Sequence, residues 1–407
     1  MNTQDHINLS ERFSARNYHP LPVVLARGEG VWVWDVDGNR YMDCLSAYSA
    51  VNQGHCHPAI LQTMMDQARL LTLTSRAFRN DQLGLLYKEV CELTHSHKML
   101  PMNSGAEAVE TVIKAVRKWG YTVKGVPENK AEIIVCANNF HGRTIAAVAM
   151  SDEPQYQQGF GPFPPGFLNV EYGNIDALAN AINENTAAFI VEPIQGEGGI
   201  VIPPEGYLRA AAQLCREHNV LLIADEIQTG LGRTGKLLAC QHEGVNPDGL
   251  ILGKALGGGI LPVSMFLARR DVMEVFTPGD HGSTFGGNPL GAAVGLEALN
   301  ILIDEKLADN SARMGRYLLD ELAKIDSPVV KEVRGRGLFI GLEINPELAS
   351  ARAICEALME RGLLSKETHQ TVVRLAPPLV IGKAELDWAI RQIREVIAEI
   401  DDLRLAS

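Results

Sequence analysis

The stretch from residue 220 to residue 259 constrains the fold more than any other, because it holds two continuous apolar runs that each lead to a charged residue. The runs, 220–224 and 249–252, are typical of strands that are buried on both faces of a parallel sheet covered by helices. Asp225 and Lys254 follow them. Open α/β sheets bind their ligands just past the carboxyl ends of the strands. We therefore predict that both side chains lie at one edge of a central sheet.

Lys254 lies among glycines, with Gly253 before it and 257–259 shortly after it. A lysine that is partly desolvated against backbone has a lowered amine pKa, which suits Schiff-base chemistry. An aspartate at the same edge needs a cationic partner. Pyridoxal phosphate accounts for both residues, since its aldehyde condenses with a lysine amine and a carboxylate keeps its ring nitrogen protonated. The plainer interpretation is that Lys254 closes a strand and Asp225 caps a turn.

Composition limits the class of protein. With 407 residues the chain exceeds one ordinary domain, so we expect a large domain with a smaller second one. Hydrophobic residues make up 46% and charged residues 21%, as in soluble globular proteins, and no apolar run is long enough to span a membrane. The net charge of -12 argues against a nucleic-acid surface. Seven cysteines without a Cys-x-x-Cys pair, and an N-terminus without an export signal, predict reduced thiols in the cytoplasm.

A phosphate-binding helix start is predicted near Gly105. Ser104 and Glu107 have the spacing of a capping box, so a helix is expected to begin there. Its free N–H groups, beside a glycine that permits close approach, would cradle a phosphate. An ordinary capped helix has the same pattern.

Two more apolar runs, at 133–136 and 187–191, predict further strands that lead into polar segments. After the first run, Phe140 could stack on a planar ring and Arg143 could clamp a carboxylate with its forked guanidinium. Simple packing or a surface ion pair would account for either residue equally well. The glycine-rich loop 281–289 opens a long helical segment, and its hydroxyl groups could reach a phosphate.

The chain ends carry different patterns. Near the N-terminus, 31–34 and 41–42 flank an Asp-Gly turn and predict a hairpin, while His55 and His57 lack a third ligand, so no metal site is predicted. From about 300 onward, amphipathic helices alternate with strands, which suggests a smaller α/β domain. The expected helices are 307–325, 350–362 and 383–403, and the expected strands are 337–344 and 371–375.

Over almost its whole length the chain resembles the class III aminotransferases, a family of fold-type I pyridoxal-phosphate enzymes. Dispersed stretches carry the resemblance: 17–23, 46–58, 71–78, 117–125, 224–230, 281–289 and 374–379. It implies an α/β fold in which a large domain has a mostly parallel central sheet covered by helices, and both chain ends form a smaller α/β domain. The expected boundaries are 1–48 for an N-terminal segment packed on the small domain, 49–300 for the large cofactor domain and 301–407 for the C-terminal domain.

The resemblance also implies roles in binding pyridoxal 5'-phosphate. Lys254 would hold the cofactor and carry the proton, and Asp225 would pair with the ring nitrogen. The other expected cofactor contacts are Gly105, Ala106, Phe140 and Gln228, with Ser283 and Thr284 reaching the phosphate from a second subunit. The implied assembly is a homodimer with shared active sites, open to higher assembly.

For substrates the resemblance implies ornithine and 2-oxoglutarate. Tyr18 and Arg143 would hold the α-amino and α-carboxylate ends of ornithine, and Tyr48 would shape the pocket. Arg374 would be covered by Glu197 when ornithine binds and uncovered for 2-oxoglutarate. A movable carboxylate suits this task, because an unpaired buried guanidinium is costly.

Alternatives stay open at this stage. The segments 103–108 and 140–144 look more like family members that act on N-acetylornithine, whereas Tyr18 and 47–49 favour a free α-amino group. Other ω-amine donors fit the same scaffold. A binding protein without cofactor is a rival of a different class, since a fold does not dictate function. A nicotinamide-dependent enzyme is set aside because no Gly-x-Gly-x-x-Gly follows a strand and opens a helix.

Overall fold

The computed structural model describes residues 1–406, and a seven-stranded sheet forms its centre. The strand order is β4-β10-β9-β8-β7-β5-β6, and β10 is the one strand that runs antiparallel to its neighbours. The strands are β4 (Lys98–Met102), β5 (Glu132–Cys136), β6 (Phe167–Val170), β7 (Thr186–Val191), β8 (Leu221–Asp225), β9 (Gly249–Leu252) and β10 (Ser264–Ala268). Every residue of β7, β8, β9 and β10 is buried, as continuous apolar runs predict.

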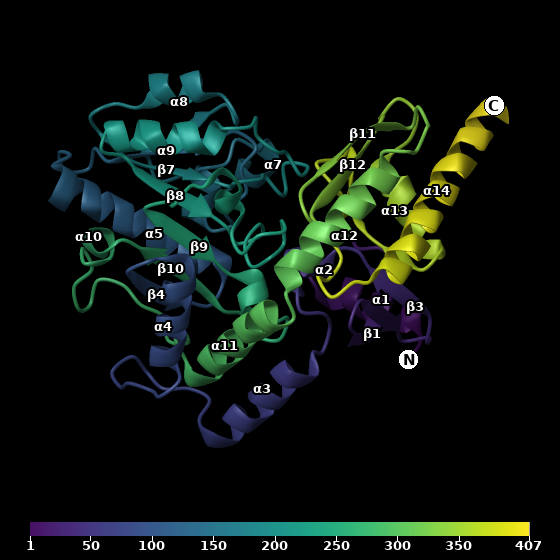
Figure 1. Cartoon of the computed structure of the whole chain (residues 1–407), viewed down its shortest axis with the longest axis horizontal. Helices are drawn as coiled ribbons and strands as arrows, with labels where there is room; N and C mark the ends of the chain where they lie inside the picture. The colour runs from purple at the N-terminus through teal and green to yellow at the C-terminus, as the bar shows by residue number, and fades with distance from the viewer. Residues whose placement is uncertain (407) are drawn as a thin grey trace.

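Helices cover both faces of this sheet (Figure 1). Side chains alternate along each strand, so Ile133 and Ile134 pack into different hydrophobic clusters. One cluster contains α5 (Gly105–Trp119) and α10 (Arg270–Met273), and the other contains α8 (Ile175–Ala181), α9 (Tyr207–Glu217) and α11 (Pro289–Asp304). The remaining helices of this half of the molecule are α3 (Pro58–Leu70), α4 (Leu83–Thr94), α6 (Ile145–Ala149) and α7 (Pro154–Gln157).

Two smaller sheets bring the chain ends together (Figure 1). The first has the order β1-β2-β3-β13 and the second β11-β12-β15-β14. Their strands are β1 (Leu25–Glu29), β2 (Trp32–Asp35), β3 (Arg40–Asp43), β11 (Val330–Gly335), β12 (Ile340–Ile344), β13 (Leu363–Leu364), β14 (Lys366–Thr368) and β15 (Val372–Leu375). Because β13 pairs with β3, N-terminal and C-terminal segments share one sheet. The helices beside them are α1 (Thr3–Phe13), α12 (Leu307–Leu322), α13 (Ala351–Glu360) and α14 (Lys383–Ala406).

The expected C-terminal helices are present, but the prediction of the C-terminal strands was incomplete. The predicted strand 337–344 is shorter in the structure, and β11, β13 and β14 were not predicted. β11 carries three charged residues in six and is only partly buried, so it lacks the apolar alternation that marks a strand. The domain boundaries at 48 and 300 stay a prediction. Among the helices of residues 1–406, none combines the length and apolar character needed to cross a bilayer.

A buried arginine joins the large sheet to the smaller ones. Arg233, in the loop after β8, donates from Nη1 to the carbonyl oxygens of Leu338 at 2.8 Å and Pro377 at 2.6 Å. Its Nη2 donates to Asn52 Oδ1 at 2.5 Å. Burial lowers the pKa of Arg233 to about 9. Backbone of Thr234 packs directly on Gly337, whose φ is +58°, so a Cβ there would lie 2.4 Å from the Thr234 carbonyl carbon.

The substitution Gly337→Ala should destabilise this junction far more than Gly244→Ala. Gly244 also has positive φ, at +66°, but no atom lies within 4 Å of the added Cβ. Both variants carry the backbone cost of about 1 kcal/mol for a left-handed alanine. Only Gly337→Ala adds the clash, for an expected loss of about 3 kcal/mol or more in the free energy of unfolding. Urea unfolding of both variants measures the difference, and equal losses would contradict the packing argument.

Candidate active site

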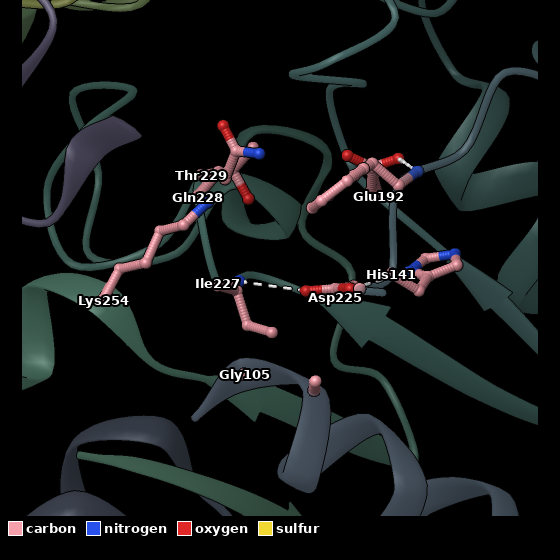
Figure 2. Close-up of a pocket in the computed structure, with 11 residues that line it drawn as sticks. Gly105, His141, Glu192, Asp225, Ile227, Gln228, Thr229 and Lys254 are labelled. Atoms are coloured by element: carbon pink, nitrogen blue, oxygen red, sulfur yellow. Dashed lines mark hydrogen bonds and ion pairs between the residues drawn. The ribbon is translucent and has the colours of Figure 1, made fainter. Parts of the chain in front are cut away.

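The carboxyl ends of β7, β8 and β9 meet at one edge of the large sheet and carry three ionisable groups (Figure 2). Glu192 follows β7, Asp225 ends β8 and Lys254 follows β9 after Gly253. All three line one pocket, together with Gly105, Ala106, Phe140, His141, Gly142, Ile227, Gln228 and Thr229. The pocket has a volume of about 170 Å³. This is on the order of ten times the space that one water needs, so the pocket has room for an organic ligand.

Lys254 has the electrostatic setting of a reactive amine. Burial lowers its pKa to about 8, and the positive charge of Arg374 acts in the same direction, while Glu197 opposes both. Its backbone has φ of +47°, a conformation that is rare for residues other than glycine. Such backbone strain concentrates at functional sites, where the surrounding structure holds it in place.

Asp225 is held by a histidine rather than by solvent. His141 Nδ1 lies 2.7 Å from Asp225 Oδ2, and both side chains are buried. Although burial lowers the histidine pKa, the hydrogen bond and charge of Asp225, with the charge of Glu192, raise it overall. Glu192 accepts hydrogen bonds from the backbone N–H of Phe140 and Gly196, yet burial raises its pKa to about 7. The contact with His141 therefore fixes the Asp225 carboxyl group on the pocket floor.

The start of α5 forms the opposite wall of the pocket (Figure 2). Ser104 Oγ accepts from Glu107 N, and Glu107 Oε2 accepts from Ser104 N at 2.7 Å, which completes the predicted capping box. The first N–H groups of a helix have no partner inside the helix. Gly105 packs against Ile227 so closely that a Cβ would lie 2.9 Å from its Cδ1. The N–H groups of Gly105 and Ala106 are therefore available to an anion in the pocket.

Arg374 forms the second charged centre, and it is fully buried on β15. Its Nη1 donates to Glu197 Oε1 at 2.9 Å. Its Nη2 donates to Gln228 Oε1 at 2.8 Å and to Ser49 Oγ at 3.2 Å. Gln228 Nε2 also donates to Glu197 Oε1, at 3.2 Å, so the amide bridges the ion pair. A side chain at Gly196 would collide with Gln228, because its Cβ would lie 2.6 Å from Oε1.

Two tyrosines predicted as substrate ligands lie near this centre in different settings. Tyr48 is half-buried, and its ring lies 5.8 Å from the Arg374 guanidinium carbon. It belongs to a turn, α2 (Ser46–Ser49), in which all four residues have positive φ. Tyr18 is exposed, and its segment 15–22 is tied to the body of the protein by Arg352, which donates to the carbonyl oxygens of His19 and Pro20.

Arg143 is exposed beside the pocket rather than paired with a carboxylate. Its guanidinium carbon lies 3.5 Å from the ring centre of Tyr156 and 5.2 Å from that of Phe140. Phe140 packs edge-on against Tyr156 and lines the pocket. The stacking holds the guanidinium in place at the edge of the pocket.

Ser283 and Thr284 lie outside the pocket of their own chain. Ser283 Oγ accepts from Asn103 Nδ2 at 2.9 Å and from Gly286 N at 3.2 Å, so it stabilises its own loop. Thr284 is exposed, and so is the neighbouring Phe285. A single chain therefore does not bring these two hydroxyl groups to the other predicted cofactor ligands.

The family model "Aminotransferase class-III" matches residues 13–397. The chain belongs to the class III aminotransferases. An ornithine aminotransferase of Exiguobacterium sp. is 62% identical over 396 residues, which cover 97% of this chain and 98% of that relative. The solved ornithine aminotransferase from Toxoplasma gondii matches with a TM-score of 0.98 at 46% identity, covering 99% of this chain and 96% of that one.

A solved acetylornithine aminotransferase from Elizabethkingia anophelis matches with a TM-score of 0.89 at 49% identity, covering 98% of this chain and 100% of that one. These matches confirm the expected fold-type I architecture and identify this class III aminotransferase as an enzyme that uses pyridoxal phosphate. The site residues fit that cofactor. Lys254 offers an amine of lowered pKa, Asp225 a buried carboxylate, and the α5 start the free backbone N–H groups of a helix end, at a glycine that packs closely on Ile227.

Several residues of this aminotransferase site escaped the sequence prediction. Glu192 follows a strand just as Asp225 does, so the same reasoning would have found it. The contacts of His141 and Ser49 gave no signal, because hydrogen bonds to Asp225 and Arg374 span 84 and 325 residues. Tyr156 lies on α7, whose sequence shows no motif. Within the described residues no three His, Cys, Asp or Glu side chains are grouped so as to hold a metal ion.

The rate at which Lys254 condenses with an aldehyde should rise with pH up to about pH 8 and then level off. Only the neutral amine reacts, and the lowered pKa means that this form predominates above about pH 8 instead of above about pH 10.4, the value for a free lysine. The rate at which the visible absorbance of bound pyridoxal phosphate appears in apoenzyme measures this dependence. A rate that keeps rising tenfold per pH unit up to pH 10 would contradict it, and Lys254→Ala, which removes the amine, serves as the blank.

Proposed function

We propose that this aminotransferase transfers the δ-amino group of L-ornithine to 2-oxoglutarate, giving L-glutamate 5-semialdehyde and L-glutamate. The observation that carries the proposal is the buried Arg374 paired with a partly exposed carboxylate, Glu197. An enzyme of this specificity must accept a terminal amine in one half-reaction and an α-keto acid in the next. The relatives named ornithine aminotransferase, at 62% identity and below, support the same donor.

The two half-reactions need Arg374 in different states, paired with Glu197 in one and uncovered in the other. While Glu197 covers the guanidinium, Arg374 is neutralised and does not bind an α-carboxylate, so the pocket accepts the δ-amino end of ornithine, which carries no carboxylate. When the carboxylate moves aside, the guanidinium is free to bind the α-carboxylate of 2-oxoglutarate with its forked donors. The position of Glu197 suits movement, because Gly196 and Gly198 flank it and its side chain is 20% exposed, whereas Arg374 is fully buried.

The far end of ornithine is assigned to the pocket mouth. Arg143 is stacked on Tyr156 with free donors, and we assign it the α-carboxylate. Tyr18 is assigned the α-amino group, with Tyr48 shaping the space between. This arrangement leaves the δ-amine directed at the sheet edge.

Lys254 and Asp225 are assigned the catalytic roles, namely proton transfer and pairing with the cofactor ring. Bound pyridoxal phosphate supplies an electron sink for the pair of electrons released when a carbon–hydrogen bond breaks. Lys254 Nζ, with its lowered pKa, would take the proton from the δ-carbon of ornithine and deliver it to the cofactor carbon. Asp225, held in place by His141, would pair with the ring nitrogen. Phe140 is assigned to stacking on the ring, Gln228 to its hydroxyl group, and Gly105 with Ala106 to the phosphate.

The cellular setting and pathway extend the proposal. We assign the enzyme to the cytoplasm. We also assign it to ornithine and arginine breakdown or proline synthesis, because the semialdehyde cyclises to a proline precursor. Bacterial relatives such as the one from Bacillus subtilis support this setting.

A single-turnover spectrum tests the donor. Holoenzyme mixed with L-ornithine in the absence of a keto acid should lose its visible band at least tenfold faster than with N-acetylornithine at equal concentration, because the acetyl group removes the charge that Tyr18 is expected to meet. A faster loss with N-acetylornithine would assign the enzyme to the acetylated substrate instead. Trapping of the cyclised semialdehyde identifies the product.

We also propose a homodimer in which Thr284 of one subunit completes the phosphate site of the other, with Ser283 nearby. Thr284 is exposed in the single chain and is adjacent to Phe285, a large apolar side chain with 55% exposure. An exposed phenylalanine beside a hydroxyl group that lies outside the pocket of its own chain supports a subunit interface at this loop.

Mixing two impaired variants tests the shared site. Lys254→Ala should be inactive and Thr284→Ala should bind pyridoxal phosphate more weakly. In a co-refolded equal mixture, half of the dimers are mixed and each holds one intact site, so activity should return to about a quarter of wild type. No recovery in verified mixed dimers would show that each chain builds its own site.

A further inference from the structure

Lys366 lies beside Arg374 on the neighbouring strand. β14 pairs with β15 in antiparallel register, and Lys366 is directly opposite Arg374. Side chains at directly opposite positions of an antiparallel pair point to the same face of the sheet, with Cβ atoms about 5 Å apart. The two cations therefore rise side by side from the sheet that borders the pocket.

Unlike Arg374, Lys366 has no carboxylate partner within the described part of the chain. Its ammonium group donates to the backbone oxygen of Glu367 at 2.9 Å, and its side chain is only partly exposed. A lysine ammonium has three donors, so it can accept further partners. A half-buried cation next to a buried guanidinium gains from any anion that comes within reach.

Glu197 is that anion. The charges that lower its pKa are those of Arg374, Lys254 and Lys366, and the hydrogen bond from Gln228 acts in the same direction, against the effect of burial. Both hydrogen bonds that Glu197 accepts go to Oε1. It is flanked by Gly196 and Gly198, and Gly199 beyond them has φ of +106°, so the loop backbone has few side chains to obstruct a rotation.

Movement of Glu197 away from Arg374 requires a destination for its carboxylate. Arg374 keeps neutral partners when Glu197 leaves, because Ser49 and Gln228 still accept from Nη2 and the Phe339 ring lies 5.0 Å from its guanidinium carbon. The hydrogen bonds that Glu197 accepts come from Arg374 and from the Gln228 amide alone within the described residues, so one neutral donor is all that it could keep. A carboxylate that leaves one cation inside a partly buried site is strongly disfavoured unless another cation receives it.

We propose that Lys366 receives the carboxylate of Glu197 when Arg374 is released for the keto acid. The inference rests on the proposed function, in which Glu197 covers and uncovers Arg374. It makes Lys366 a positioning residue that selects for the acceptor half-reaction. Ornithine reacts while Glu197 covers Arg374, so the donor half-reaction does not need Lys366.

Half-reaction kinetics of Lys366→Gln test the proposal. Reaction of the pyridoxamine-phosphate form with 2-oxoglutarate should show kcat/KM lowered about tenfold, mainly through the binding of the keto acid, a coupling of ordinary size for interacting charges. Reaction of the pyridoxal-phosphate form with ornithine should stay within about twofold of wild type. Lys366→Arg should retain most of the activity, and Lys331→Gln, an exposed lysine on β11 of the same sheet, should change neither half-reaction.

A double-mutant cycle with Glu197→Ala distinguishes a Lys366 that receives the Glu197 carboxylate from a Lys366 that contacts the substrate directly. Without Glu197 no carboxylate needs a destination, so Lys366→Gln should have no further effect on the 2-oxoglutarate half-reaction in that background. An undiminished tenfold loss there would overturn the proposal and place Lys366 on the substrate itself. Equal losses in both half-reactions of the single variant would also overturn it, as a structural effect.

Failure of the proposed donor gives a different result. The pyridoxamine-phosphate form is prepared directly from apoenzyme and cofactor, so the 2-oxoglutarate half-reaction is measured without ornithine. Wild type that reacts with 2-oxoglutarate but not with ornithine would overturn the donor assignment. The double-mutant cycle would then still support or overturn the role of Lys366.

Discussion

The structure depends above all on charges that are buried in opposite pairs. Removing a carboxylate or an ammonium group from water costs several kcal/mol unless a partner and hydrogen bonds replace the solvent. Asp225 has His141, and Arg374 has Glu197 with two neutral acceptors. Of these three groups only Lys254 lacks a direct partner in the described structure, and its pKa falls to about 8. The same burial that threatens stability therefore produces a reactive amine.

The site also contains strained backbone, which costs free energy of folding. Lys254 has positive φ, and so do four successive residues from Ser46 to Ser49. Left-handed conformations cost roughly 1–2 kcal/mol per residue outside glycine. The turn is fixed by Asp43 Oδ1, which accepts from the N–H groups of Leu45 and Ser46, and by Ser46 Oγ, which donates to the carbonyl oxygen of Ala376. These contacts hold Ser49 against Arg374, so N-terminal, central and C-terminal segments meet at one ion pair.

Much of the fold was predictable because strong local patterns specify it. Continuous apolar runs gave the strands that became β5, β7, β8 and β9, and the Ser104 capping box gave the start of α5. β11, β13 and β14 were missed because short, charged or two-residue strands are stabilised by pairing with distant neighbours rather than by their own sequence. The roles assigned to Tyr18, Tyr48 and Arg143 stay predictions, since their functional partners are substrates.

The sequence by itself determined which residues stand at the carboxyl ends of the strands, because the strands and their burial on both faces follow from the local apolar pattern. It therefore also determined that Asp225 and Lys254 share one sheet edge. Only the tertiary structure decided which side chains meet around the site. His141 with Asp225, Ser49 with Arg374, and Lys366 beside Arg374 are pairings between distant segments or short strands. Such contacts form when sheets close on one another, and no local pattern encodes the register in which they close.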